Sequence, residues 1–291
     1  MDASSGFMIA IAAAVVLGII LFNNKQVEDE LLALEDTDTN SDAAPDLIEI
    51  PTKEDIKWLK EDLKSARETQ DKREEADLLN KLGRIYLQLE KHEEAIPYFQ
   101  QAMDVEWEIG NRPGQCKNLA SLAQVHTTLG QHEKASEYYL QQLDVTRQLH
   151  ALKGEGAALL GLASSYIALE QHEQAIEPLQ LAINIFQMTG SREAEKTAIE
   201  NLIKTFNFLG QYDEALEYYQ QALENAIADN DRIAEVEAEW QIGLLYEKMD
   251  DLDEAIHHMQ QLINFYREIY HEDLKKHEAY LDELKEKARW K

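Results

Sequence analysis

Three histidines recur at one spacing, and they are the residues of this chain that most resemble a site for chemistry. His92, His132 and His172 lie forty residues apart, each in a short turn between two stretches of helical periodicity. Equivalent side chains on stacked helices are about 10 Å apart, whereas ligands of one metal ion lie about 2 Å from it. The equivalent position holds Tyr212 in the fourth repeat and Leu252 in the fifth, as a half-buried packing position would tolerate. The pattern predicts a packing position and not a metal site.

The remaining candidate groups lack the arrangement that catalysis needs. The sequence has no glycine-rich phosphate loop, no Ser-His-Asp arrangement and no zinc-ligand spacing. Carboxylates are abundant, but none is paired with an apolar pocket that the sequence identifies, as acid–base catalysis requires. The single cysteine, Cys116, excludes an intramolecular disulfide and is typical of a reducing compartment. We therefore predict a protein that is not an enzyme and needs no cofactor.

A forty-residue repeat organises most of the chain and must position its side chains. The repeat occurs five times without insertion or deletion, over residues 71–110, 111–150, 151–190, 191–230 and 231–270. One column holds only alanine: Ala95, Ala135, Ala175, Ala215 and Ala255. Within each repeat, apolar residues recur at helical spacing in two blocks, which predicts two antiparallel helices. Such helix pairs bury their apolar faces only against neighbouring pairs.

Both ends of the repeat array need a cap. Residues 53–70 carry apolar side chains in the columns of a second helix (Ile56, Leu59 and Leu63), and Thr52 with Asp55 matches a capping box. Residues 271–291 are charged, with leucines at roughly helical spacing. We predict an all-α fold, a right-handed α-solenoid of five helix pairs with a capping helix at each end.

The first repeat carries a recognisable signature. Leu82-Gly83-x-x-Tyr86, followed by Ala95-x-x-x-Phe99-x-x-Ala102, resembles the tetratricopeptide repeat. Most positions of this signature match in all five repeats. The usual period of that family is 34 residues. A forty-residue period with a lengthened second helix resembles the subgroup found in kinesin light chains, which commonly places asparagine before the Leu-Gly pair. Here that column holds Lys81, Ser121, Gly161, Asn201 and Gln241, so no asparagine ladder is expected.

The resemblance places a protein-binding groove along the inward columns of the first helices. The pattern of the sub-type that clamps chaperone C-termini is absent. The candidate groove residues are Asn80, Arg84, Gln124, Leu160, Ser164, Glu200, Lys204, Phe208, Trp240 and Leu244. The leucines and aromatic residues among them predict a partly apolar groove for a helix or an extended segment. The alternative is that neighbouring helices cover some of these side chains.

Residues 1–25 have the composition of a membrane anchor. No charge lies between Asp2 and Lys25, and residues 7–22 are apolar apart from Gly18. As a helix the uncharged stretch spans roughly 33 Å, enough for a bilayer core. A secretory signal peptide is the alternative, but no basic residue precedes the apolar run and no cleavage site clearly follows it. We expect one transmembrane helix, with Lys25 favouring repeats on the cytoplasmic side.

An acidic segment joins the anchor to the repeats. Residues 26–52 contain nine acids and no base, which predicts an extended, disordered tether. The whole chain has a formal net charge of -28. Such a charge repels nucleic acid and favours basic or neutral partner surfaces. Much of the acidity is explained by the need for a soluble surface.

These features together predict a membrane-tethered scaffold that captures partner proteins at a raised effective concentration. The organisation also resembles membrane-anchored thylakoid tetratricopeptide repeat proteins of cyanobacteria. That resemblance implies a role in chlorophyll synthesis and photosystem assembly, with the light-dependent protochlorophyllide oxidoreductase or photosystem assembly components as partners. Two alternatives remain: a structural component of an envelope or secretion machine, and a self-associating homo-oligomer closed by Trp107, Trp240 or Trp290.

Overall fold

The computed structural model describes residues 52–269 and 271–290, and their regular structure is entirely α-helical. The predicted anchor (residues 1–25) and nearly all of the predicted tether (residues 26–52) lie outside these residues. Among the described helices, none combines the length and the apolar character that crossing a bilayer requires. The chain divides into two compact units, residues 1–198 and 199–291, which we describe separately.

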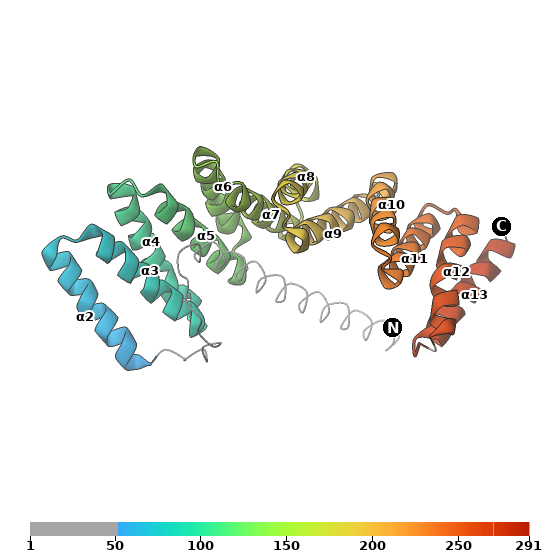
Figure 1. Ribbon diagram of the computed structural model, residues 1–291, viewed down its shortest axis with the longest axis horizontal. Helices are drawn as coiled ribbons and strands as arrows, with labels where there is room; N and C mark the ends of the chain where they lie inside the picture. The colour runs from blue at the N-terminus through green and yellow to red at the C-terminus, as the bar shows by residue number, and fades with distance from the viewer. Residues whose placement is uncertain (1–51, 270, 291) are drawn as a thin grey trace. The chain divides into compact units, whose positions relative to one another are not determined.

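Each unit is built from helices that pack against the next helix in the chain (Figure 1). Unit 1 contains α2 (Lys53–Thr69), α3 (Lys72–Gln88), α4 (His92–Glu108), α5 (Arg112–Thr128), α6 (His132–Gln148), α7 (Leu152–Ala168) and α8 (His172–Thr189). The boundary between the units falls within α9 (Arg192–Leu209). Unit 2 continues with α10 (Tyr212–Asp229), α11 (Arg232–Lys248), α12 (Leu252–Glu268) and α13 (Leu274–Arg289). The first and second helices of a repeat therefore alternate along the chain.

A left-handed residue ends nearly every helix, at intervals of twenty residues. Gly110 has φ 71° and Glu90 has φ 57°, and the same conformation recurs at residues 70, 130, 150, 170, 190, 210, 230 and 250. The next backbone N–H then turns back into the helix, as in the 2.8 Å bond from Lys91 N to Tyr86 O. The first two helix pairs have helices of 17 residues each. The two helices of each of these pairs are therefore equally long, because the turns divide the forty residues evenly.

Small residues allow the helices of a pair to approach closely. All five members of the alanine column have 0% exposure: Ala95, Ala135, Ala175, Ala215 and Ala255. Gly83 of α3 faces the ring of Phe99 of α4, and an added Cβ would lie 2.7 Å from its Cε1 atom. Large side chains opposite small ones fill the space between the helices, as close packing requires.

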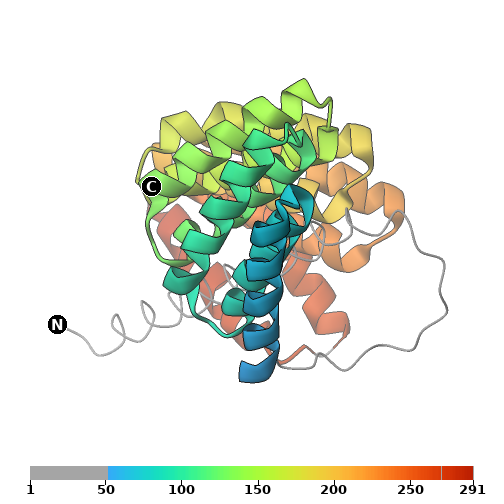
Figure 2. The ribbon, with the colours of Figure 1, turned by 90° about the vertical axis from the view of Figure 1, so that its left-hand side faces the viewer.

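Helix α2 closes the N-terminal end of unit 1, where it stands nearest the viewer in Figure 2. Its capping box is formed as the sequence indicates: Asp55 N donates to Thr52 Oγ1 at 3.2 Å, and Thr52 N donates to Asp55 Oδ2 at 2.7 Å. Leu63 and Ala66 are buried in one cluster with apolar residues of α3 and α4. The cap thus covers the apolar face that the first repeat would otherwise expose.

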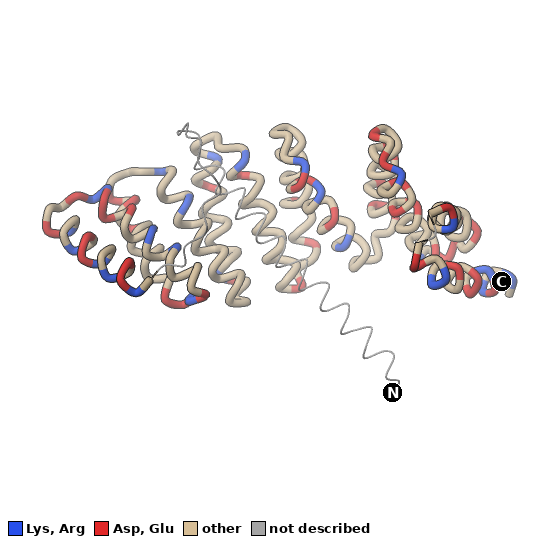
Figure 3. The backbone as a smooth tube through the Cα atoms, turned by 60° about the horizontal axis from the view of Figure 1, so that its bottom comes forward, with Lys and Arg blue, Asp and Glu red and all other residues tan. Residues whose placement is uncertain are grey.

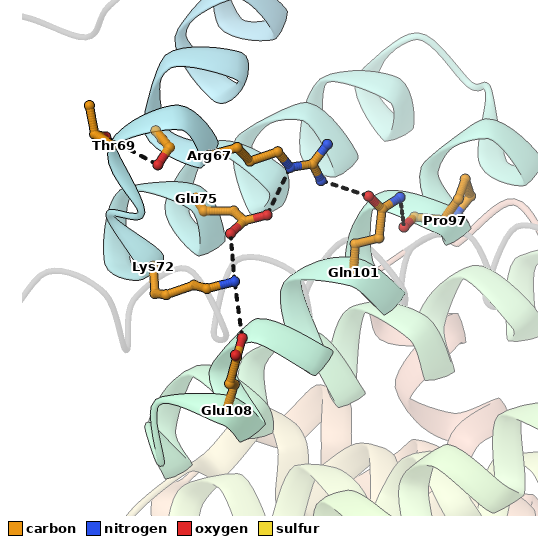
Figure 4. A network of polar contacts seen from close by, with 8 residues as sticks. Arg67, Thr69, Lys72, Glu75, Pro97, Gln101 and Glu108 are labelled. Carbon is orange, nitrogen blue, oxygen red and sulfur yellow. Dashed lines mark hydrogen bonds and ion pairs between the residues drawn. The ribbon is translucent and has the colours of Figure 1, made fainter.

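A polar network holds α2 against the first repeat (Figure 4). The Glu75 carboxylate accepts from Arg67 Nε at 2.8 Å and from Lys72 Nζ at 3.2 Å, and Lys72 also contacts Glu108 at 3.0 Å. Burial alone would raise the pKa of Glu75, but Arg67 and Lys72 hold it below its usual value. Arg147 and Glu155 repeat the contact between α6 and α7 at 2.8 Å. This ion pair links the end of a second helix to the start of the following first helix.

Helix α13 covers the apolar face at the end of unit 2. Leu281 and Leu284 are 2% and 3% exposed, and they share a cluster with Met259 and Ile263 of α12. Lys287 Nζ reaches Glu247 of α11 at 3.4 Å. The closing helix therefore contacts both helices of the fifth repeat.

Candidate functional site

The first helices α3 and α5 lie side by side in unit 1. Asn80 Nδ2 donates to Asn118 Oδ1 at 2.9 Å, and Asn118 Nδ2 donates to Gly114 O at 3.1 Å. Asn118 is 1% exposed, whereas Asn80 is half-buried. Asn80 therefore joins two repeats, and only part of its side chain remains available to a partner.

The column of Asn80 becomes fully buried further along unit 1. Leu160 is 4% exposed and Ala120 is 7% exposed. These side chains face other helices and not solvent, because this column lies at the contact between successive first helices. The structure therefore removes Leu160 from the predicted groove.

The column of Arg84 remains accessible and is polar. Arg84 is exposed, and Gln124 and Ser164 are half-buried. Tyr139 donates to Gln124 Oε1 at 3.5 Å, and Ser164 Oγ donates to the carbonyl of Leu160 at 2.9 Å. The accessible face of the first helices of unit 1 is thus lined by polar and small side chains, in contrast to the partly apolar groove that we expected.

Three more predicted groove residues lie on α9. Glu200 and Lys204 form an exposed ion pair one turn apart, with Oε2 and Nζ at 3.9 Å. Such a pair contributes little to stability, about 0.3–0.5 kcal/mol. Phe208 follows one turn later and is 68% exposed. Phe208 is therefore the one predicted apolar anchor that is mostly accessible.

Helix α13 packs against the remaining two apolar anchors, Trp240 and Leu244, which are half-buried. The Trp240 ring meets His277 edge-on at 4.6 Å between centroids and lies 5.7 Å from Tyr280. Leu244 packs against the apolar cluster that α12 and α13 form. Burial and the hydrogen bond from Tyr280 to Glu247 raise the pKa of Tyr280 to about 12. Trp240 and Leu244 therefore hold the closing helix, because α13 packs where a sixth first helix would stand.

Lys81 and Lys117 belong to the accessible face of unit 1, and our sequence-based groove did not include them. Lys81 follows Asn80 and Lys117 precedes Asn118, so the two lysines flank the asparagine pair, and both are exposed. Acidic residues occur along the helices of both units (Figure 3). The sequence does contain a signal for them. Basic residues are half as numerous as acidic ones in this chain, so a comparison of charge at equivalent positions of the five repeats would have singled out the two lysines.

Glu106 lies beneath this face and is buried. It is 6% exposed, and its carboxyl packs against Gly114, where an added Cβ would lie 2.3 Å from a Glu106 oxygen. Burial raises the pKa of Glu106. The Asn111 hydrogen bond and Lys117 lower it, and Asp77 raises it. Asp77 and Lys117 are therefore both close enough to Glu106 to influence its pKa.

We expect Glu106→Gln to stabilise unit 1 at neutral pH. Because the pKa is raised above 4.5 in the folded state, the stability of the parent protein falls as pH rises through that raised pKa. The variant has no such loss. Its unfolding free energy should be higher by about 1 kcal/mol at pH 7, and its melting temperature higher by about 2–4 °C.

The control for this prediction is Glu137→Gln, which changes an exposed acid. Its melting temperature should match that of the parent. Thermal melts at pH 4 and pH 7 test the sign, because the advantage of Glu106→Gln should shrink at the lower pH. A variant that melts below the parent at pH 7 would show that the ionised carboxylate is stabilising.

The histidine column lies at the start of the second helices. His92, His132 and His172 are the first residues of α4, α6 and α8, one in each repeat. Within residues 52–269 and 271–290, no three His, Cys, Asp or Glu side chains form a group that could hold a metal ion. Cys116 is half-buried on α5, and burial raises the pKa of its thiol. A raised pKa disfavours the reactive thiolate.

Comparison with known families agrees with this architecture. A tetratricopeptide repeat model matches residues 114–188 and 193–268, which is more than half of the chain, and a second one matches residues 76–106. The chain belongs to the tetratricopeptide repeat family. Tetratricopeptide repeats are scaffolds for protein–protein interaction and are typically non-catalytic. No curated protein matches the sequence.

Several solved tetratricopeptide-like structures share the fold at low sequence identity. Aspartyl phosphate phosphatase F from Bacillus subtilis is 17% identical with a TM-score of 0.52, over 80% of this chain and 64% of that chain. A putative kinesin light chain repeat protein from Podospora anserina is 18% identical with a TM-score of 0.55, over 66% and 95%. A signal transduction ATPase with a tetratricopeptide repeat sensor from Pyrococcus horikoshii is 18% identical with a TM-score of 0.57, over 79% and 36%. At these identities the likeness shows the fold alone.

Proposed function

We propose that this tetratricopeptide repeat protein is a membrane-tethered assembly factor that binds partner proteins on the first helices of unit 1. The observation that carries the proposal is the accessible polar face formed by Arg84, Gln124 and Ser164 on α3, α5 and α7. Side chains on a rigid helix stack are pre-organised, so that little entropy is lost when a partner binds. Adjacent helices also repeat the same column, which suits an extended segment that crosses several repeats.

The anchor part of the proposal rests on the sequence of residues 1–25. A helix there would confine the repeats to two dimensions, and residues 26–52 would let them stand away from the bilayer. Lys25 favours the cytoplasmic side. In the finer form of the proposal, the membrane is the thylakoid and the partners are protochlorophyllide oxidoreductase or photosystem assembly components. That form is supported by the resemblance in overall organisation.

Affinity capture from native membranes tests the binding face. The double variant Gln124→Arg with Ser164→Arg places two long charged side chains on the face, and the control variant Gln141→Arg with Gln180→Arg places them at exposed positions of second helices. We expect the parent and the control to recover the same partners, and the face variant to recover at most about one tenth as much.

The readout is quantitative mass spectrometry on the full-length protein in mild detergent. Equal recovery by all three proteins would place the binding site elsewhere. Recovery of pigment-synthesis enzymes or photosystem subunits would support the finer proposal, whereas recovery of this protein alone would replace it with self-association. Protease added to sealed vesicles tests the orientation, because only outward-facing repeats are digested.

A further inference from the structure

Three cations gather on the accessible face of unit 1, which we call the cationic face: Lys81 and Arg84 on α3 and Lys117 on α5. All three are exposed. The Asn80–Asn118 hydrogen bond of 2.9 Å holds the two helices together between the lysines, and Arg84 lies one helical turn beyond Asn80. The three charges therefore occupy exposed positions on two helices that this hydrogen bond joins.

The surroundings of the cationic face contain few acids on the first helices. Asp77 lies one turn before Lys81, at the edge of the group, where it and Lys117 both act on Glu106. The matching columns of α5 and α7 hold neutral residues: Ser121, Gln124, Thr128, Ala157, Gly161, Ser164 and Ala168. The whole chain, by contrast, has 56 acids and 28 bases. A basic surface in so acidic a protein favours an acidic ligand.

An acidic ligand is attached to the same unit. Residues 26–52 contain nine acids and no base: Glu28, Asp29, Glu30, Glu35, Asp36, Asp38, Asp42, Asp46 and Glu49. The segment ends at Thr52, the N-cap of α2, and α2 packs on α3 through Leu63 and Ala66. A chain of this length extends at most about 90 Å, whereas α2 is about 25 Å long. The segment is therefore long enough to reach the cationic face, and covalent attachment through a linker of this length gives an effective concentration near the millimolar range.

We propose that residues 26–52 bind the cationic face of their own chain and compete there with partner proteins. The carboxylates pair with Lys81, Arg84 and Lys117, and the neutral columns of α5 and α7 accommodate the rest of the segment. Because a partner must displace the segment, the apparent affinity for that partner equals its intrinsic affinity multiplied by the fraction of chains in which the face is open. The competition with partners rests on the function proposed above, but the contact between segment and face does not.

A labelled synthetic peptide of residues 26–52 tests the contact in the full-length protein. We compare the parent with a variant in which Asn and Gln replace the nine acids. In the parent, the attached segment competes with the added peptide, whereas in the neutralised variant the face is open. We expect the peptide to bind the neutralised variant at least about tenfold more tightly than the parent. Raised salt should weaken the binding, since exposed charges are screened.

A second comparison assigns the site. In the neutralised background, Lys81→Gln with Arg84→Gln and Lys117→Gln should weaken peptide binding about tenfold or more. Lys57→Gln with Lys64→Gln and Lys134→Gln removes the same charge from other exposed positions and should leave it unchanged. Circular dichroism checks that both triple variants remain folded.

Equal affinity of the peptide for the parent and the neutralised variant would overturn the proposal. So would equal losses in the two triple variants, which would indicate a general charge effect. Carbodiimide cross-linking adds an independent readout: links from Lys81 or Lys117 to residues 28–49 should form within one chain at every protein concentration. Links that form only between chains would overturn binding in cis. None of these measurements uses a partner protein. A negative result here would therefore not contradict the proposed function, which the affinity capture experiment tests separately.

Discussion

Ala135→Arg is expected to unfold unit 1, with a loss of unfolding free energy of at least about 4 kcal/mol. Ala135 of α6 has 0% exposure, and it lies in a cluster with Ala123 of α5 and Leu162 of α7. An arginine there must push three helices apart and bury a charge without a partner. Because the core runs continuously through neighbouring repeats, the damage should spread beyond one helix pair. Far-ultraviolet circular dichroism during a thermal melt measures the loss.

The control for this prediction is Ala168→Arg, which introduces the same side chain at an exposed position of α7. Its stability should remain within about 0.5 kcal/mol of the parent. If Ala135→Arg melted together with this control, the α5–α6 contact would have to be looser than the buried alanine column indicates. Limited proteolysis would then locate the opening.

Trp240→Ala is expected to release α13 from the end of unit 2. The Trp240 ring contacts His277 and Tyr280 of α13, and it packs against the apolar cluster that contains Leu281 and Leu284. Removing the indole leaves a cavity between the fifth repeat and its cap, and the expected loss is about 2–3 kcal/mol. Hydrogen exchange should accelerate mainly in residues 274–289, because this helix contacts the rest of the unit on one side only.

The matched control is Trp290→Ala, since Trp290 is 90% exposed. Its exchange pattern and melting temperature should equal those of the parent. Trp240→Ala with unchanged exchange in α13 but weaker partner capture would restore Trp240 to the binding groove, as the sequence had indicated. The two outcomes separate a packing role from a binding role at the same residue.

The repeat itself could be predicted from the sequence because it depends on interactions that recur at one spacing. The alanine column and the pairing of Gly83 with Phe99 both follow from a choice of small residues opposite large ones. The capping box of Thr52 and Asp55 is equally local, with partners three residues apart. The left-handed residues at the turns were harder to predict from the sequence. Gly110 marks its turn, but Glu90 adopts the same left-handed conformation without glycine.

The sequence by itself thus determined the helix pairs, their period and the columns that face the core, because these features are set by neighbours at fixed spacing. Only the tertiary structure decided which inward columns reach solvent. Leu160 is buried by neighbouring helices, Trp240 is half-buried against α13, and Lys81 beside Asn80 remains exposed. Exposure depends on what the adjacent helix places opposite each side chain, and that partner lies about forty residues away in the chain. A binding face is therefore a property of the stacked helices and not of any single repeat.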